Sequence, residues 1–455
     1  MSENMKKVAF RNLGCKVNEY EMEYMQQRMV EKGYSFVPFD TKADIYVVNT
    51  CTVTNIADRK SRQMLHRAKK TNPDAIVVAV GCYVQTDTEG ASKDSAIDIL
   101  IGNNQKGRLP EIIEEYLLER EKTAAENDTN AIKSVRVIDI SKESEYENMH
   151  IEKTAEHTRA FVKIQDGCNQ FCSYCAIPLA RGRIRSRGVE DVLSEVRDLA
   201  KNGYKEIVLT GIHLSSYGIE DKYKSYNEMA RLKETNTALL NVISKVSNID
   251  GIERIRLGSL EPRLITEDFL RELSKVDKLC PHFHLSLQSG CNETLKRMNR
   301  HYTTEEFKES VGLLRKYFND PAITTDVIVG FPGETAEEFE ITRHFLSEIG
   351  FFEMHVFKYS RRKNTVADKL PNQVSDADKD IRSDELLSLD EKMSDRFKNR
   401  YLGREVEVLF EECVDGEFIG HTREYIKVAA KGNINLCGQI RKLVLDGESL
   451  YFTSK

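Results

Sequence analysis

Short apolar runs alternate with helical segments in the N-terminal part of the chain. The runs are rich in Val and Ile, are bounded by Gly, Asn or Asp as buried strands are, and lie at 7–13, 44–50 and 75–81. Between the first two runs, Met22, Met25 and Met29 recur along one helix face. This alternation predicts a parallel sheet with helices on its faces.

Six further strand-like runs occupy the centre of the chain, with amphipathic helical segments between them. They lie at 159–165, 206–211, 253–258, 282–288, 323–329 and 351–357. Six strand–helix units over roughly 200 residues predict an incomplete (β/α)6 barrel of the TIM type, because a full eight-unit barrel needs about 250 residues. A doubly wound sheet is the alternative.

The linker region and the C-terminal part of the chain lack this alternation of strands and helices. Residues 119–152 are charged and poor in aromatics, which predicts an exposed linker with one strand at 135–140. After a charged helical connector, the tail has short alternating runs separated by Gly, Asp and Asn. These runs, the last of them at 449–454, predict a small five-stranded β-barrel.

The fold class is therefore α/β, and we expect four segments. They are an N-terminal parallel α/β domain at 1–118, the linker at 119–152, the central barrel at 153–385, and the connector with the small β-barrel at 386–455.

Composition excludes several classes of protein. Hydrophobic residues make up 40% and charged residues 31% of the chain, as in proteins with packed cores. The 67 basic and 73 acidic residues give a net charge of −6, which is no overall signal for nucleic acid. No 18-residue apolar run and no leader are present, so we expect a cytoplasmic protein without a membrane segment. Its ten cysteines are then expected to be metal ligands, reactive groups or core residues rather than disulfides.

The strongest local signal is the run GCNQFCSYC, which places Cys168, Cys172 and Cys175 directly after the first predicted barrel strand. Three thiolates on one loop can bind a single metal centre. A zinc site usually takes four ligands, and no fourth cysteine or histidine stands nearby in sequence. An iron–sulfur cluster held by three cysteines leaves one iron open, at the strand ends where barrels place their catalytic groups.

A second triad is more widely spaced. Cys15, Cys51 and Cys82 each follow a predicted strand of the N-terminal sheet. The carboxyl ends of parallel strands share one edge, so these cysteines are expected to meet there and hold a second cluster with an open iron. The other four cysteines show no ligand spacing and are expected to be core or surface thiols: Cys280, Cys291, Cys413 and Cys437.

The C-x3-C-x2-C run resembles the motif of the radical S-adenosylmethionine (SAM) family, and DVIVGFPGE at 326–334 resembles its adenine-binding strand end. The resemblance implies that SAM binds the open iron and is cleaved by one electron to methionine and a 5′-deoxyadenosyl radical. Cys168, Cys172 and Cys175 would then be the catalytic cysteines. One feature departs from the family, because its Gly-Gly-Glu after the second strand is Thr210-Gly211-Ile212-His213 here.

The two triads together resemble the methylthiotransferase branch of that family, whose members end in a TRAM domain. This resemblance implies two 4Fe–4S clusters as cofactors beside SAM, one on each triad. It also implies a reducing electron donor such as flavodoxin or ferredoxin. In that branch, the radical removes hydrogen from an unactivated carbon, to which a methylthio group is attached, and a second SAM supplies the methyl group.

The amino-acid sequence around the first cysteine, Cys15, indicates the substrate. NLGCKVNEYE resembles the branch that converts N6-threonylcarbamoyladenosine, next to the anticodon of tRNA, into its 2-methylthio derivative. The alternatives are N6-isopentenyladenosine in tRNA, whose branch has Gln-Met-Asn after this cysteine, and a ribosomal protein aspartate, whose branch has Pro-Lys-Asn. Lys16-Val17-Asn18 fits neither.

Two hypotheses of other kinds stay open. One is a radical SAM enzyme with cobalamin in its first domain, although the sequence has no Asp-x-His-x-x-Gly motif. The other is a non-catalytic iron–sulfur or zinc protein that binds RNA through its tail.

Two basic runs follow the predicted clusters and are expected to contact tRNA phosphates, the alternative being solvated helix faces. They contain Arg59, Lys60, Arg62, Arg67, Lys69 and Lys70, and Arg181, Arg183, Arg185 and Arg187.

Further cofactor-binding residues are expected at or near the barrel strand ends, where polar groups and close backbone approach serve a ligand. They are Tyr174, Gly211, Ser259, Glu261, Gln288, Gly330 and Gly333. At each glycine, a simple turn is the alternative explanation.

Overall fold

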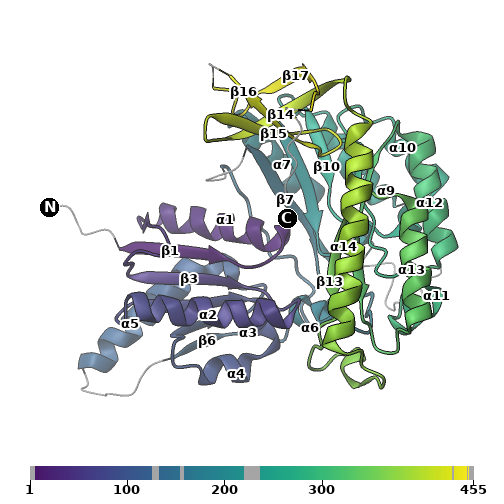
Figure 1. Cartoon of the computed structure of the whole chain (residues 1–455). Helices are drawn as coiled ribbons and strands as arrows, with labels where there is room; N and C mark the ends of the chain where they lie inside the picture. The colour runs from purple at the N-terminus through teal and green to yellow at the C-terminus, as the bar shows by residue number, and fades with distance from the viewer. Residues whose placement is uncertain are drawn as a thin grey trace.

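The computed structural model of the chain describes residues 6–125, 133–153, 158–219, 236–432, 435–447 and 449. Three groups of strands follow one another along the chain, and Figure 1 shows the first as a separate layer beside the second. No helix in these ranges is long and apolar enough to cross a bilayer.

The N-terminal sheet has six parallel strands in the order β2-β1-β3-β4-β5-β6. Their bounds are β1 Lys7–Asn12, β2 Ser35–Phe36, β3 Ile45–Thr50, β4 Ile76–Gly81, β5 Ile99–Ile101 and β6 Ser134–Arg136. All three strands predicted for this domain are confirmed. Every residue of β3 and β4 is buried, because helices cover both faces of the sheet.

The helices of this domain pack in two layers. Helices α1 (Lys16–Glu31) and α5 (Leu109–Ala125) share a core with one face of the sheet. Helices α2 (Asn55–Thr71), α3 (Cys82–Thr86) and α4 (Thr88–Lys93) cover the other face. The methionines predicted on one face of α1 lie there, with Met25 and Met29 fully buried against the sheet.

Six parallel strands form the predicted incomplete barrel: β7 Arg159–Asp166, β9 Glu206–Gly211, β10 Arg254–Leu257, β11 His282–His284, β12 Ala322–Val329 and β13 Glu353–Lys358. Isolated bridges such as Leu260–Leu285 join its two halves. The outer helices are α7 Val189–Lys201, α9 Thr237–Ser247, α10 Glu267–Leu273, α12 Thr304–Tyr317, α13 Ala336–Ile349 and α14 Asp376–Asn399. They form a single core with one face of the strands, so the doubly wound alternative is wrong.

The other face of these strands is the barrel interior, and helix α1 packs against it. Tyr20 lies in a small core with Phe161 of β7 and Val208 of β9. Its hydroxyl donates to the Met149 carbonyl over 2.8 Å. The N-terminal domain therefore closes one side of the incomplete barrel through a helix of its own.

The C-terminal segment forms an antiparallel sheet in the order β16-β15-β14-β17. Its strands are β14 Glu405–Val414, β15 Glu417–Thr422, β16 Lys427–Lys431 and β17 Ile440–Val444. The last of the predicted runs, at 449–454, lies, except for Ser449, outside the described residues. Arg254 at the start of β10 donates to the Glu407 carbonyl over 2.7 Å, so this sheet sits at the amino-terminal end of the barrel.

Two elements fall within the predicted linker. Helix α5 continues to Ala125, and the strand expected at 135–140 is β6, Ser134–Arg136, which pairs with β5. The boundaries of the four segments stay predictions.

A buried carboxylate joins the N-terminal domain to the barrel. Glu21 of α1 is 1% exposed and accepts from Lys106 Nζ over 2.5 Å, Lys163 Nζ over 2.7 Å and Arg181 Nη1 over 2.5 Å. Burial alone would raise the pKa of Glu21, but the charges of Arg181, Lys106 and Lys163 hold it well below the usual range. Lys106 belongs to the N-terminal domain, whereas Lys163 and Arg181 belong to the barrel.

We predict that Glu21→Ala lowers the free energy of unfolding by about 3–5 kcal/mol, because it leaves three buried cations without their shared partner. Urea unfolding followed by circular dichroism measures this, since the chain has no Trp. Glu89→Ala is the control, because the exposed Glu89 pairs with the equally exposed Lys93 on its own helix. Equal unfolding midpoints for the two variants would contradict the prediction.

Candidate metal centres and cofactor site

The three N-terminal cysteines lie at the carboxyl ends of neighbouring strands, as expected. Cys15 is the N-cap of α1 after β1, Cys51 follows β3, and Cys82 begins α3 after β4. Burial, together with the neighbouring Cys82 and Cys15, raises the pKa of the Cys51 thiol to about 12. The sulfurs are therefore close enough to interact electrically.

Each of these sulfurs has a polar neighbour. Cys51 Sγ accepts from the Val53 backbone N–H over 3.5 Å, and Cys82 Sγ accepts from Asn103 Nδ2 over 3.6 Å. Asn103 Nδ2 also donates to the Ala180 carbonyl of the barrel over 2.7 Å. The amide of Asn103 thus fixes Cys82 relative to the barrel.

The barrel triad lies on the loop after β7, which ends at helix α6 (Ile177–Arg181). The loop begins at Gly167, whose φ is 70° and whose missing Cβ would stand 1.7 Å from the Arg183 carbonyl oxygen. Only glycine fits that approach, which turns the chain back so that Cys168, Cys172 and Cys175 lie together.

The sulfurs of this triad accept hydrogen bonds from both backbone and side chain. Cys168 Sγ accepts from the Gln170 N–H and Cys175 Sγ from the Ile177 N–H, each over 3.4 Å. Cys172 Sγ accepts from Arg300 Nη1 over 3.2 Å. Hydrogen bonds to sulfur are one means by which proteins tune iron–sulfur clusters.

The chemistry of both donor sets fits a cluster. Burial raises the pKa of Cys168 and brings that of Cys175 to about 12, and Cys172 adds to both shifts. Such thiols lose their protons when they bind a cation. No three cysteine sulfurs of the described residues lie within 4.8 Å of one another, so neither triad converges on a single ion. Ligands of a cubane, which bind different irons, are spaced more widely.

Glu261 lies beside the barrel triad and contacts both the cysteine loop and the segment after the second barrel strand. Its carboxylate accepts from Gln170 Nε2, on the cysteine loop, over 2.7 Å and lies 3.2 Å from His213 Nε2. Burial would raise the pKa of Glu261, but the His213 hydrogen bond and the Arg263 charge lower it far below the usual range. A buried, ionised carboxylate thus stands next to the segment from which the family's glutamate is missing.

The other predicted SAM residues lie near the barrel's carboxyl end in different settings. Tyr174 packs edge-on against Phe331 at 6.4 Å, Ser259 is exposed, and Gln288 is buried with a φ of 72°. The other three are glycines, and at each of them a side chain would crowd a neighbouring residue. A Cβ at Gly211 would stand 2.9 Å from Gln165, a Cβ at Gly330 would stand 2.3 Å from Lys379, and a Cβ at Gly333 would stand 3.3 Å from Arg297. Contacts of all six with SAM stay predictions.

The second basic run does not present a phosphate-binding surface, so that expectation is wrong. Arg181, Arg185 and Arg187 are at most 2% exposed, and only Arg183 faces solvent. The buried arginines pair with Glu21, Asp166 and Glu195 inside the protein. In the first run, which lies on α2, most of the basic side chains are exposed, as phosphate contacts require.

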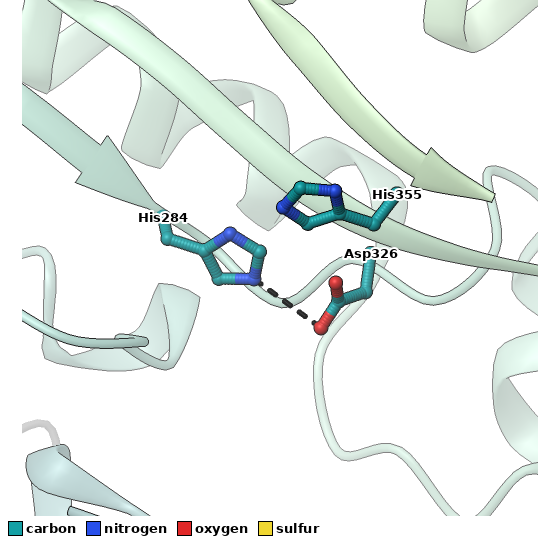
Figure 2. A group of neighbouring side chains, drawn as sticks. All are labelled: His284, Asp326 and His355. Atoms are coloured by element: carbon teal, nitrogen blue, oxygen red, sulfur yellow. Dashed lines mark ion pairs between the residues drawn. The ribbon is translucent and has the colours of Figure 1, made fainter. Parts of the chain in front are cut away.

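Sequence reasoning missed a polar cluster inside the barrel, formed by His284, Asp326 and His355. Figure 2 shows the three side chains converging from adjacent strands. The signal was available, because alternate residues of β11, β12 and β13 pack in the outer core and the residues between them must face inward.

Two family models match the chain. The radical SAM superfamily matches residues 162–346, and a family described as uncharacterized protein family UPF0004 matches residues 7–102. Each interval contains one of the two cysteine triads.

Curated relatives match almost the whole chain. It is 40% identical to threonylcarbamoyladenosine tRNA methylthiotransferase MtaB of Bacillus subtilis, covering 96% of this chain and 93% of the relative. It is 39% identical to the protein of that name from Aquifex aeolicus, covering 96% and 100%. It is 34% identical to tRNA-2-methylthio-N(6)-dimethylallyladenosine synthase of Clostridium botulinum, covering 90% and 88%.

Among solved structures, the chain resembles the radical SAM methyltransferase TsrM from Kitasatospora setae with cobalamin and a 4Fe–4S cluster bound. The TM-score is 0.56 at 14% identity, covering 80% of this chain and 74% of that one. The likeness establishes a shared fold.

We predict that the two triads load independently. Anaerobic reconstitution should give about eight irons per chain, and Cys172→Ala or Cys51→Ala should each reduce this to about four, since each breaks one cubane. Iron and sulfide analysis checks this, with Cys413→Ala as the control because Cys413 is exposed and lies on β14. The assignment of the triads would fail if Cys413→Ala lost as much iron as the triad variants.

Proposed function

Because the chain belongs to the family of threonylcarbamoyladenosine tRNA methylthiotransferases, we propose that it adds a 2-methylthio group to N6-threonylcarbamoyladenosine beside the anticodon of tRNA. One observation carries the proposal: two cysteine triads stand at strand ends of two packed domains in a chain that matches these relatives along almost its whole length. The chain is 40% and 39% identical to two of these relatives, against 34% for the dimethylallyladenosine synthase of Clostridium botulinum.

Two sets of ligands follow from this proposal. Cys168, Cys172 and Cys175 would hold the SAM-binding 4Fe–4S cluster, and the auxiliary cluster would be held by Cys15, Cys51 and Cys82. When bound, the clusters and SAM supply the radical, sulfur and methyl chemistry. The remaining contributions belong to the protein, which orients the groups and excludes water.

Several side chains have definite positioning roles in this proposal. Arg300 holds a positive charge against Cys172, and the Arg300 guanidinium also donates to the Ser286 carbonyl, which fixes its direction. We assign Glu261 to the SAM amino group, in place of the glutamate that the family carries after its second strand. Its ionised carboxylate is held by Gln170, His213 and Arg263, and its charge suits a cationic amine.

The partners follow from the same proposal. The exposed basic face of α2, with Arg183 beside the cluster loop, would contact tRNA phosphates. Arg183 stacks over the Phe171 ring at 4.8 Å, which places its charge near Cys172. A flavodoxin or ferredoxin would supply electrons, and the location would be cytoplasmic, where tRNA is modified. The four predicted segments would be the N-terminal methylthiotransferase domain, the linker, the radical SAM domain and the TRAM region.

The substrate is tested in cells that lack the gene. We expect their tRNA to contain N6-threonylcarbamoyladenosine without its 2-methylthio derivative, as measured by mass spectrometry of nucleosides. Reintroduced wild-type protein should restore the derivative and Cys172→Ala should not. Loss of 2-methylthio-N6-dimethylallyladenosine instead would assign the chain to the sister activity.

The role of Glu261 is tested with Glu261→Gln. The loss of one charge-assisted hydrogen bond, worth about 1.5–3 kcal/mol, should raise the KM for SAM in 5′-deoxyadenosine formation about 10- to 100-fold. Glu293→Gln on the outer surface is the control. An unchanged KM in a variant with normal iron content would contradict the assignment.

A further inference from the structure

The barrel interior contains a cluster of polar groups that the proposed catalytic residues do not use. His284 Nε2 lies 3.3 Å from Asp326 Oδ2, and His284 Nδ1 lies 3.1 Å from Thr324 Oγ1. His355 stacks on His284 with ring centroids 5.9 Å apart and is exposed. Figure 2 shows that the three side chains point toward one another from β11, β12 and β13.

The N-terminal domain adds a cation to this cluster. Lys16, the first residue of α1, follows Cys15 directly and interacts electrically with Asp326, Arg159 and Arg256 of the barrel. Lys16 is exposed to solvent, and desolvation together with the charges of Arg159 and Arg256 lowers its pKa. No carboxylate in the described parts of the chain forms an ion pair with its ammonium group.

Two residues of this group are close in sequence to residues of the proposed cofactor sites. Lys16 is next to an auxiliary-cluster ligand, and Asp326 is four residues before Gly330 at the carboxyl end of β12. A substrate atom positioned to react at both iron–sulfur clusters would therefore bring its neighbouring substituent close to Lys16 and Asp326.

We propose that Lys16, His284, Asp326 and His355 form the subsite for the N6-threonylcarbamoyl substituent and so determine the choice of substrate. This inference rests on the proposed function and specifies how the substituent is recognised. Lys16 and the imidazole N–H groups would donate to the threonine carboxylate, and Asp326 would accept from a urea N–H. The carboxylate and one urea N–H of the substituent then have partners of the right kind.

The same groups explain rejection of the sister substrate. A dimethylallyl group offers no hydrogen-bond partner, so its binding would remove water from Lys16 and Asp326 without compensation. Sites built to pair with polar groups reject analogues that lack them much more strongly than apolar pockets reject extra groups. Discrimination would therefore arise from unpaired protein groups.

The charges around the cluster favour an anionic ligand over a metal ion. Two histidines and a carboxylate are also a possible ligand set for a divalent cation. However, Lys16 interacts electrically with Asp326, whereas the nearby Arg159 and Arg256 are already paired with Glu411 and Glu206. The ammonium group of Lys16 would repel a dication and attract a carboxylate.

The experiment compares two RNAs that differ in one charge. Anticodon stem-loops carry either N6-threonylcarbamoyladenosine or its methyl ester, and reconstituted holoenzyme is tested for methylthiolation and, by fluorescence anisotropy, for binding. Wild-type protein should prefer the free carboxylate about 10- to 100-fold in kcat/KM, as expected for one charge-assisted hydrogen bond. Lys16→Met should remove most of this preference. We expect it to slow methylthiolation of the RNA with the free carboxylate and to leave methylthiolation of the methyl-ester RNA almost unchanged.

Two further variants make the test decisive. Lys245→Met on the outer helix α9 is the matched control and should keep the full preference. His355→Gln, far in sequence from every cluster cysteine, should weaken the preference even if Lys16→Met disturbs the auxiliary cluster. Iron content is measured for each variant.

The inference is overturned if wild-type protein treats acid and ester alike, or if Lys16→Met and His355→Gln slow both RNAs equally. Zinc or iron beyond the two clusters that His355→Gln removes would also overturn it, in favour of a metal site. Formation of 5′-deoxyadenosine without methylthiolation of either RNA would instead refute the proposed function.

Discussion

The arrangement of both cysteine triads depends on one buried carboxylate. Glu21 stands six residues after Cys15 on α1 and pairs with cations from its own domain and from the barrel. A buried charge is costly unless its partners are close and well directed, so this contact tolerates little sliding between the domains. Arg181, one of these partners, lies at the end of the helix that follows Cys175 and also donates to Asn18 over 2.7 Å.

Other contacts across the same interface act together with Glu21. Tyr20 and Arg187 both contact the buried Glu195 of α7, while Arg362 after β13 pairs with Asp58 of α2 over 2.6 Å. The interface is thus fixed at several places around the cysteines. The consequence is chemical: a reaction that needs a radical at one site and sulfur at another requires a fixed separation, and polar contacts of defined geometry supply it better than apolar packing.

The strands and both triads could be predicted because they are local patterns. Apolar runs such as 44–50 and 323–329 specify buried strands directly, and each triad is defined by its place after such runs. The roles of Arg181, Arg185 and Arg187 could not be predicted, since a run of arginines does not show where its carboxylates are. Glu21 draws its cations from positions 106, 163 and 181, which only the folded chain brings together. Strands as short as β5 lack enough residues for a recognisable pattern.

Helix α1 also couples domain docking to substrate choice. Its first residue, Lys16, interacts electrically with Asp326 of β12, while Glu21, five residues later, anchors the same helix to the barrel. A rigid helix holds these two residues in a fixed relation, so the position of the proposed subsite is set by the contact that also sets the position of Cys15. Recognition of the substituent and placement of the sulfur-bearing cluster would then be geometrically inseparable. A change of substrate within this fold would therefore require new side chains on α1 and in the barrel interior while the Glu21 contact is kept.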